Sequence, residues 1–326
     1  MAVMKRRLTI LIPLFNDWES LMILLPRLDV AIGSAAMCGS VFVIDDASTL
    51  ALPDNLRECS FRNLSCVNVV HLRSNIGHQR ALAVGLALPE CVIPGVDAVV
   101  VMDGDGEDNP EHVPRLVAEL MAHPRPHVVF AARARRLERP TFQIMYYAFQ
   151  ITHKILTGIA VRVGNFSALD PSAAGRLLAV PDLWNHYAAA VFRSRIPFST
   201  VPLARDKRYR GQSHMEYSHL VAHGLSAIAV FSDVVGARLI MATATLMAAL
   251  LVLLVGVLII RLYTDIAVPG WATMSGGLLM MLFMQAFLAL LILMFIVLGN
   301  RSRNMFIPLR DAGNFVESVE TVCLNR

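Results

Sequence analysis

The sequence lacks several motifs that would assign it to a common enzyme class. Its 326 residues contain no G-x-x-x-x-G-K-[ST], no G-x-G-x-x-G and no G-x-S-x-G. These are the signatures of phosphate-binding loops, dinucleotide-binding folds and α/β-hydrolase nucleophiles. Internal repeats and low-complexity linkers are also missing. The sequence therefore does not support any of these three enzyme classes.

Cysteines are few, and the charge is nearly balanced. An odd number of cysteines, without C-x-x-C spacing, is scattered over the chain. This pattern predicts reduced thiols in a cytosolic domain rather than a disulfide framework or a zinc site. The formal net charge is only +4, so we expect no nucleic-acid partner.

The N-terminus superficially resembles a secretory signal, because a basic tripeptide at residues 5–7 precedes an apolar run over residues 8–15. Pro13 interrupts this run, and polar residues follow it without a small-residue cleavage site. We therefore expect residues 8–14 to form a buried first strand.

Apolar residues, by contrast, are abundant: they make up 56% of the chain, and the mean hydropathy is +0.55. Residues 239–260 contain no charged side chain, and residues 271–298 contain only one strongly polar side chain, Gln285. Each stretch exceeds the roughly 20 residues that cross a bilayer. Arg238 precedes the first stretch and Arg301 follows the second. The positive-inside rule therefore predicts a hairpin with both outer ends in the cytoplasm.

The hairpin divides the chain into four parts. We expect a cytoplasmic domain over residues 1–212, an interface helix over 213–238, the transmembrane hairpin over 239–298 and a cytoplasmic tail over 299–326. Within the first part, the stretch 140–158 carries aromatic residues at positions i, i+4 and i+7. This spacing predicts a helix in the membrane interface, with an ordinary core helix as the alternative.

Short apolar runs alternate with helical patterns up to about residue 135. The expected strands cover residues 8–14, 41–44, 67–71, 98–102 and 127–131, and the expected helices cover 17–32, 77–88 and 111–122. Continuous apolar strands separated by helices predict an α/β fold with a mostly parallel sheet that is covered on both faces.

Polar side chains follow three of these strands. They are Asn16 and Asp17, then Asp45 and Asp46, then Asp103 and Asp105. Parallel sheets bind ligands outside the carboxyl ends of their strands. We therefore expect the three polar pairs to meet at one rim of the sheet.

The last strand end is the most acidic, with carboxylates at Asp103, Asp105, Glu107 and Asp108. Such crowding resists joint ionisation unless a cation is present. Mg²⁺ and Mn²⁺ prefer oxygen ligands, and Mg²⁺ usually binds through one or two carboxylates plus substrate phosphates. The loop predicts a metal and diphosphate site; the alternative is a solvated turn before a helix that begins at Pro110.

Four segments together resemble the family 2 glycosyltransferases of the GT-A fold. They are IPLFND at residues 12–17, VIDDAS at 43–48, SNIGHQRALAVGL at 74–86 and MDGDGED at 102–108. RDKRYRGQS at 205–213, followed by two spans, is similar to the polyprenyl-phosphate branch. That branch includes dolichol-phosphate mannose synthases and bacterial undecaprenyl-phosphate glucosyltransferases. The resemblance implies a Rossmann-like GT-A sheet.

The resemblance also implies roles for individual residues. The residues implied to hold the nucleotide sugar are Pro13, Phe15, Asp17, Asp45, Asp46, Asp103 and Arg133. Asp103 and Asp105 are implied to bind Mg²⁺ or Mn²⁺, and Asp105, Glu107 and Asp108 form the catalytic set. If the acceptor were a hydroxyl group, Asp108 or Glu107 would be the candidate general base.

The basic segment is a candidate site for the acceptor phosphate. Six cations lie close together at Arg193, Arg195, Arg205, Lys207, Arg208 and Arg210. Arginine's planar fork suits phosphate oxygens. We expect Arg205, Arg208, Arg210 and Ser213 to bind the phosphate; the alternative is a basic surface attracted to anionic lipid headgroups.

The sequence departs from the family pattern in three segments, at four positions. His214 stands where the basic motif ends in lysine, and Glu107 stands where glutamine is common. Asn165 and Ser167 replace the two charged residues of a D-F-R-L segment. These departures point to a different sugar, acceptor contact or cation preference.

The resemblance implies an inverting, metal-dependent hexosyltransferase that moves one sugar from a nucleotide sugar to a membrane polyprenyl phosphate. A UDP-linked donor is favoured over a GDP-linked donor, and the bacterial inner membrane is the expected location. A lipid hydroxyl acceptor and a silent nucleotide-sugar-binding scaffold subunit stay open as alternatives, and so does homo-oligomer formation.

Overall fold

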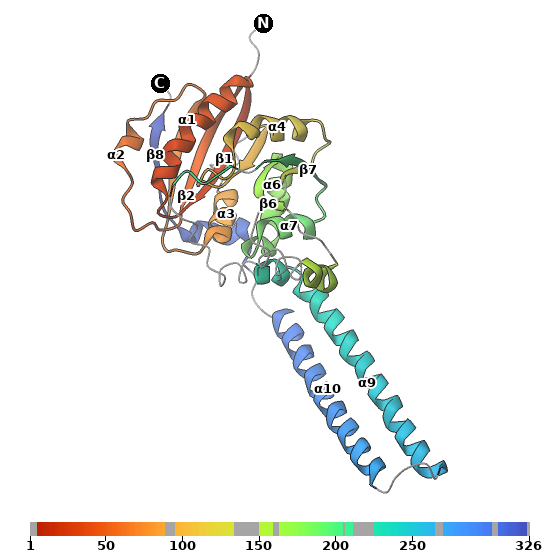
Figure 1. Ribbon diagram of the computed structural model, residues 1–326. Helices are drawn as coiled ribbons and strands as arrows, with labels where there is room; N and C mark the ends of the chain where they lie inside the picture. The colour runs from red at the N-terminus through yellow and green to blue at the C-terminus, as the bar shows by residue number, and fades with distance from the viewer. Residues whose placement is uncertain are drawn as a thin grey trace. The chain divides into compact units, whose positions relative to one another are not determined.

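The computed structural model describes residues 5–88, 95–133, 150–158, 163–204, 206–210, 224–264, 270–301 and 306–324. These residues belong to two compact units (Figure 1). The first unit comprises Met1–Gln150, Ala160–Val230 and Met305–Arg326, and the second comprises Ile151–Ile159 and Phe231–Asn304. The two units are described separately.

The first unit contains an eight-stranded sheet with the order β7-β5-β6-β4-β1-β2-β3-β8. The strands are β1 (Arg6–Leu14), β2 (Met37–Asp45), β3 (Leu64–Leu72), β4 (Ala98–Val101), β5 (Val128–Arg133), β6 (Val163–Leu169), β7 (Phe198–Leu203) and β8 (Val316–Leu324). Strands β4, β1, β2 and β3 are parallel, as are β5 and β7, whereas β6 and β8 pair antiparallel with their neighbours. The predicted mostly parallel α/β sheet is confirmed.

Helices cover both faces of the sheet. One face packs against α1 (Trp18–Ser34) and α4 (Val113–Met121), and the other against α3 (His78–Ala87), α6 (Pro171–Leu178) and α7 (Tyr187–Arg193). Strand β1 shows why both faces need cover, because Ile10 and Leu11 point to opposite faces and are both fully buried. Short elements complete the unit: α2 (Asp54–Arg57), η1 (Pro110–His112), η2 (Pro181–Trp184), α11 (Pro308–Asp311) and η3 (Ala312–Phe315).

The five predicted strands and three predicted helices of the N-terminal half are present, with ends that differ by a few residues. The sequence pattern did not indicate β6, β7 or β8. Strand β8 lies within the segment expected as a cytoplasmic tail and forms one edge of the sheet against β3. Its glutamates leave an exposed, charged edge, a feature that limits edge-to-edge aggregation.

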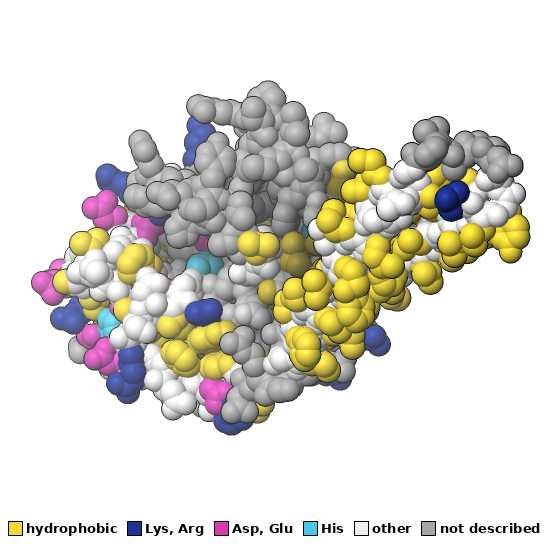
Figure 2. Space-filling view, turned by 90° about the horizontal axis from the view of Figure 1, so that it is seen from below, with side chains coloured by type: hydrophobic (Ala, Val, Ile, Leu, Met, Phe, Trp, Pro, Cys, Tyr) yellow, Lys and Arg dark blue, Asp and Glu magenta, His cyan; other side chains and the backbone are white. Residues whose placement is uncertain are grey.

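The second unit contains two long apolar helices, α9 (Ser232–Tyr263) and α10 (Trp271–Arg301). Both are long and apolar enough to cross a membrane, and Figure 2 shows hydrophobic side chains over their surface. The two helices pack closely at Gly236, where an added Cβ would lie 2.5 Å from the Val297 side chain.

The helical stretches that flank the predicted spans are only partly described. Residues 150–157 and 224–229 are helical, and a turn at 230–231 precedes α9. The span predicted to begin at residue 239 is thus continuous with a helix that begins at Ser232. The remainder of the expected interface helices, over 140–149 and 213–223, lies outside the described residues.

Candidate active site

The three polar strand ends lie at one rim of the sheet. Strands β4, β1 and β2 are adjacent and parallel, so their carboxyl ends point the same way. Asp17 stands at the N-terminus of α1, Asp45 is the last residue of β2, and Asp103 follows β4. The position of these residues at the carboxyl ends of parallel strands matches the usual ligand-binding edge of an α/β sheet.

Asn16 joins the first strand end to the loop after the second. Its side-chain oxygen accepts hydrogen bonds from the backbone N–H groups of Thr49 at 2.8 Å and Leu50 at 3.0 Å. Its backbone has a φ of 56°, a conformation that asparagine tolerates. Phe15, the preceding residue, remains 48% exposed at this rim. The sequence placed Asn16 at the rim but did not reveal this linking role.

Asp46 fixes the loop that leads into α3. Its two carboxylate oxygens accept hydrogen bonds from the N–H groups of Ile76 at 2.7 Å and Gly77 at 2.8 Å. Gly77 has a φ of +90°, which favours glycine. Burial raises the pKa of Asp46, although the two N–H groups oppose that shift. The carboxylate therefore holds the start of α3 beside the rim.

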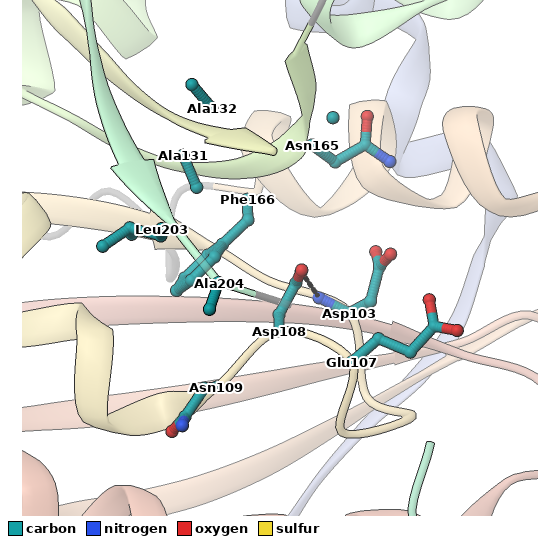
Figure 3. A pocket seen from close by; sticks show the side chains of 11 residues that line it. Asp103, Glu107, Asp108, Asn109, Ala131, Ala132, Asn165, Phe166, Leu203 and Ala204 are labelled. Atoms are coloured by element: carbon teal, nitrogen blue, oxygen red, sulfur yellow. Dashed lines mark hydrogen bonds between the residues drawn. The ribbon is translucent and has the colours of Figure 1, made fainter. Parts of the chain in front are cut away.

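The acidic loop after β4 is folded onto its own backbone. The Asp108 carboxylate accepts a hydrogen bond from the Asp103 N–H at 2.9 Å, and the Asp105 carboxylate accepts one from the Glu107 N–H at 3.0 Å. Figure 3 shows Asp108 turned toward the backbone of Asp103, whereas the Asp103 and Glu107 carboxylates extend to the same side. The four acidic residues therefore do not have equivalent surroundings.

A small, open pocket lies beside this loop. One wall carries Asp103, Glu107 and Asp108, and the facing wall is built mainly from Ala131, Ala132, Phe166, Leu203 and Ala204 (Figure 3). Asp105 is not among the lining residues. The pocket therefore combines carboxylates with an apolar wall of mostly small side chains.

The residues that replace the family's charged pair have well-defined partners. Asn165, which lines the pocket, accepts a hydrogen bond from the Gln79 side chain at 3.1 Å, and Gln79 in turn accepts one from the Tyr187 N–H. Ser167 and Tyr187 are fully buried with their hydroxyl oxygens 2.8 Å apart. Burial raises the pKa of Tyr187 strongly. Neutral hydrogen bonds thus occupy both positions.

His78 places a titratable ring next to two of the residues that line the pocket. Its Nε2 atom lies 3.3 Å from the Asp103 carboxylate and 2.9 Å from the Asn165 amide nitrogen. Burial lowers the pKa of His78, but the carboxylates of Asp103, Asp105 and Asp46 outweigh it and raise the pKa overall. In the sequence, the one feature that could have indicated the contact between His78 and Asp103 is the position of His78 at the start of a predicted helix near the rim.

The described part of the basic segment lies across the acidic loop. The N–H groups of Asp206 and Tyr209 donate hydrogen bonds to the carbonyl oxygens of Glu107 at 3.1 Å and Asp105 at 3.0 Å. Gly106 has a φ of +88°, and an added Cβ there would lie 2.4 Å from the Tyr209 ring. Backbone contacts therefore bring residues 206–210 to the predicted metal and diphosphate site.

Two arginines of this segment face acidic residues at the start of α1. Arg208 Nη2 lies 2.5 Å from Asp17 Oδ2, and Arg210 Nε lies 3.9 Å from Glu19 Oε2. Arg27 holds the Tyr209 hydroxyl at 2.8 Å. The structure thus brings predicted acceptor residues and a predicted nucleotide residue together.

Other predicted cations are elsewhere or not described. Arg193 pairs with Asp182 at 3.0 Å and donates to the Val230 carbonyl. Arg205 and Ser213 lie outside the described residues, as does the side chain of Arg133 at the end of β5.

The donor set around the acidic loop fits a hard divalent cation. Among the described residues, no three His, Cys, Asp or Glu side chains converge into a complete metal site. Mg²⁺ usually takes one or two carboxylates and completes its shell with water and substrate phosphates. The Asp103 and Asp105 carboxylates supply this type of oxygen ligand.

The fold and the acidic rim define an α/β protein that binds its ligands at the carboxyl ends of parallel strands. The chain belongs to glycosyl transferase family 2, whose sequence profile matches residues 9–178. This match covers the elements from β1 to α6, together with the acidic loop, but not β7, β8 or the two long apolar helices.

Two curated relatives illustrate the similarity. The undecaprenyl-phosphate 4-deoxy-4-formamido-L-arabinose transferase of Serratia proteamaculans is 31% identical over 131 residues, which are 40% of this chain and 38% of that protein. The dodecaprenyl-phosphate galacturonate synthase of Rhizobium johnstonii is 28% identical over 118 residues, which are 36% of this chain and 33% of that protein. The alignments thus span little more than a third of each relative.

Solved structures show a more distant similarity. The mannosyltransferase PcManGT of Pyrobaculum calidifontis, in complex with GDP-Man and Mn²⁺, has a TM-score of 0.42 and 14% identity, covering 90% of this chain and 85% of that chain. A mycobacterial protein has a TM-score of 0.49 and 18% identity, covering 71% and 75%.

Proposed function

We propose that the protein transfers one sugar from a nucleotide sugar, preferably UDP-linked, to a polyprenyl phosphate, with inversion at the anomeric carbon. The observation that carries this proposal is the contact between the basic segment and the acidic loop, through Asp206 and Tyr209. The names of the two curated relatives support the acceptor class.

The donor half of the site lies at the ends of β1, β2 and β4. Asp17 and Asp45 lie at the same rim as the exposed Phe15, and these three residues are the proposed contacts of the nucleoside. Asp103 and Asp105 would hold Mg²⁺ or Mn²⁺. When bound, that ion neutralises charge on the departing nucleoside diphosphate as a Lewis acid.

The acceptor half needs cations more than it needs a base. A phosphate monoester carries a charge of about −1.5 to −2 at neutral pH, so its oxygen is already a nucleophile. Arg208 and Arg210 are the described residues that can bind it. In one in-line displacement, the phosphate oxygen bonds to the anomeric carbon while the bond from that carbon to the nucleoside diphosphate breaks.

A hydroxyl acceptor, the alternative, would need a general base within hydrogen-bonding reach. The Asp108 carboxylate accepts the Asp103 N–H at 2.9 Å and so supports the loop, but it also lines the pocket. Glu107 lines the pocket as well. Asp108 and Glu107 are therefore both candidates if a base is used.

Chain connectivity supports the proposed membrane topology. The chain leaves the first unit at Val230 and re-enters it at Met305, and β8 then pairs with β3. Because both outer ends of the α9–α10 hairpin connect to the same folded unit, they lie on the same side of any bilayer that the hairpin spans. The flanking arginines favour the cytoplasmic side of the membrane. In bacteria this is the cytoplasmic face of the inner membrane.

The proposal is tested with the full chain in detergent or proteoliposomes. Undecaprenyl phosphate, Mg²⁺ or Mn²⁺ and a panel of UDP- and GDP-sugars should give a lipid-linked sugar detectable by mass spectrometry. Asp103→Asn should abolish the product. Asp97→Asn is the matched control, because Asp97 supports the Arg7 N–H at the opposite end of β4.

The product also distinguishes the alternatives. A glycosyl phosphate is acid-labile, whereas a glycoside made on a lipid hydroxyl is not. An acid-stable product would therefore show that the acceptor is a lipid hydroxyl and not a polyprenyl phosphate. Nucleotide binding without turnover, with every common donor, would favour the scaffold alternative.

A further inference from the structure

Asp45 is held by a residue of the neighbouring strand β3 and by a residue of the loop that follows β2. It ends β2 and is the in-register partner of His71 on the parallel strand β3. His71 Nδ1 lies 2.8 Å from Asp45 Oδ2, and the Ser48 N–H donates to Asp45 Oδ1 at 2.9 Å. The side chain of Asp45 is only 6% exposed, so these contacts define its orientation.

The C-terminal strand reaches the other side of the histidine ring. His71 lies diagonally from Glu320 on β8, a distance that long side chains can bridge. Glu320 Oε2 is 3.9 Å from His71 Nε2, and Glu320 Oε1 is 2.9 Å from Arg57 Nη2. The ring of His71 thus lies between two carboxylates, and Arg57 orients the outer one.

The chemistry of the contact determines where the His71 proton is. An ionised carboxylate only accepts hydrogen bonds, so Nδ1 must carry the proton that it shares with Asp45. Each carboxylate oxygen can accept more than one hydrogen bond. Asp45 therefore keeps acceptor capacity for a ligand while its oxygens are held by His71 and Ser48.

We propose that His71 is a positioning residue for nucleotide binding, which holds the Asp45 carboxylate in the orientation that accepts a hydrogen bond from the nucleoside of the donor. This inference rests on the proposed function, which places the nucleoside beside Asp45. His71 itself need not touch the substrate. Its removal should weaken nucleotide binding and leave the rate of the bound complex largely unchanged.

Three variants of the full chain test this role through UDP affinity, measured by calorimetry in the presence of Mn²⁺. His71→Phe removes the hydrogen bond and should weaken UDP binding about tenfold, the effect of losing one charge-assisted hydrogen bond. His71→Asn places an amide N–H near the position of Nδ1 and should stay within about threefold of wild type. His71→Gln places its amide nearer the position of Nε2 and should behave like His71→Phe.

His123→Phe is the matched control. His123 also faces a carboxylate, Glu119 at 3.2 Å, but it lies after α4 at the opposite edge of the sheet. UDP affinity should not change in this variant. When the nucleotide sugar is the varied substrate, His71→Phe should raise its KM and leave kcat unchanged.

The outcomes separate two failures. If wild-type protein binds UDP and His71→Phe binds it equally well, or if His71→Asn loses as much affinity as His71→Gln, the positioning role is overturned while the proposed function stands. If wild-type protein binds neither UDP nor GDP, both are overturned. Should His71→Phe fail to fold, the comparison of the two amide variants decides.

Discussion

Arg208 and Asp17 form an ion pair with 2.5 Å between Nη2 and Oδ2, although 191 positions separate them in the chain. The two residues were expected to serve different substrates, Asp17 the nucleotide and Arg208 the acceptor phosphate. A nucleotide that hydrogen-bonds to Asp17 competes with Arg208 for the same carboxylate. Donor binding should therefore make the guanidinium more available to an anion.

Replacing Arg208 should affect the acceptor more than the donor. We expect Arg208→Gln to raise the KM for polyprenyl phosphate by at least tenfold, because a charge-assisted, fork-shaped contact to phosphate is lost. Steady-state kinetics with the acceptor varied at saturating donor measure this effect. Arg210→Gln is the comparison: Arg210, the other proposed phosphate contact, is 65% exposed and 3.9 Å from Glu19, so its loss should raise this KM less. Equal increases in KM would contradict a larger role for Arg208 than for Arg210.

Gly106 should tolerate no side chain. Its φ of +88° disfavours other residues, and a Cβ would meet the Tyr209 ring at 2.4 Å. Gly106→Ala should therefore displace either the acidic loop or residues 206–210 and reduce kcat/KM by about tenfold or more. The control is Gly175→Ala in α6, where an added Cβ meets nothing within 4 Å. Wild-type kinetics in Gly106→Ala would show that the contact with Tyr209 is dispensable.

The N-terminal half of the fold could be predicted from sequence because its strands are buried on both sides. Strand β1 is an apolar run in the sequence for this reason, and so are parts of β2, β3 and β4. Strand β8 could not be predicted, because its sequence VESVETVCL lacks the alternation of polar and apolar residues that marks a strand. Its pairing with β3 depends on contacts across more than 240 positions. A pairing between two segments so far apart in the chain cannot be inferred from the local sequence pattern of either one.

The candidate site, like the fold, could be predicted from the sequence only in part. The motif order identified the carboxylates of the rim, and parallel strand ends explain why they meet. The roles of Asp46 and Asp108, in contrast, depend on which backbone N–H groups face them. The spacing of the residues does not reveal these hydrogen-bond partners, and nothing in the sequence linked His71 to Asp45.

Asp29 illustrates a buried carboxylate with a purely structural role. It accepts hydrogen bonds from the N–H groups of Asn63 at 2.7 Å, Leu64 at 2.8 Å and Arg62 at 3.2 Å. Asp29→Ala should lower the free energy of unfolding by about 2–4 kcal/mol, because one buried and two partly buried N–H groups lose their charged acceptor. Denaturant unfolding measures this change. Asp54→Ala, at a carboxylate that is 95% exposed, should leave stability within about 0.5 kcal/mol of wild type.

His127 should make the first unit less stable in mild acid. Burial, together with the neighbouring His123 ring stacked at 4.1 Å, lowers the pKa of His127 below its ordinary value of 6.5. As pH falls through 6.5, the unfolded chain binds a proton that the folded chain resists, so stability is present above that pH and is lost below it. The loss in free energy of unfolding is roughly 1.4 kcal/mol per unit of pKa difference.

Thermal unfolding tests this role of His127. Between neutral and mildly acidic pH, the unfolding temperature should decrease less for His127→Gln than for wild type. His112→Gln is the control and should show the same decrease as wild type. His112 ends η1, directly before α4, and no histidine among the described residues is stacked on it. If His127→Gln also shows the wild-type decrease, another group causes the acid sensitivity.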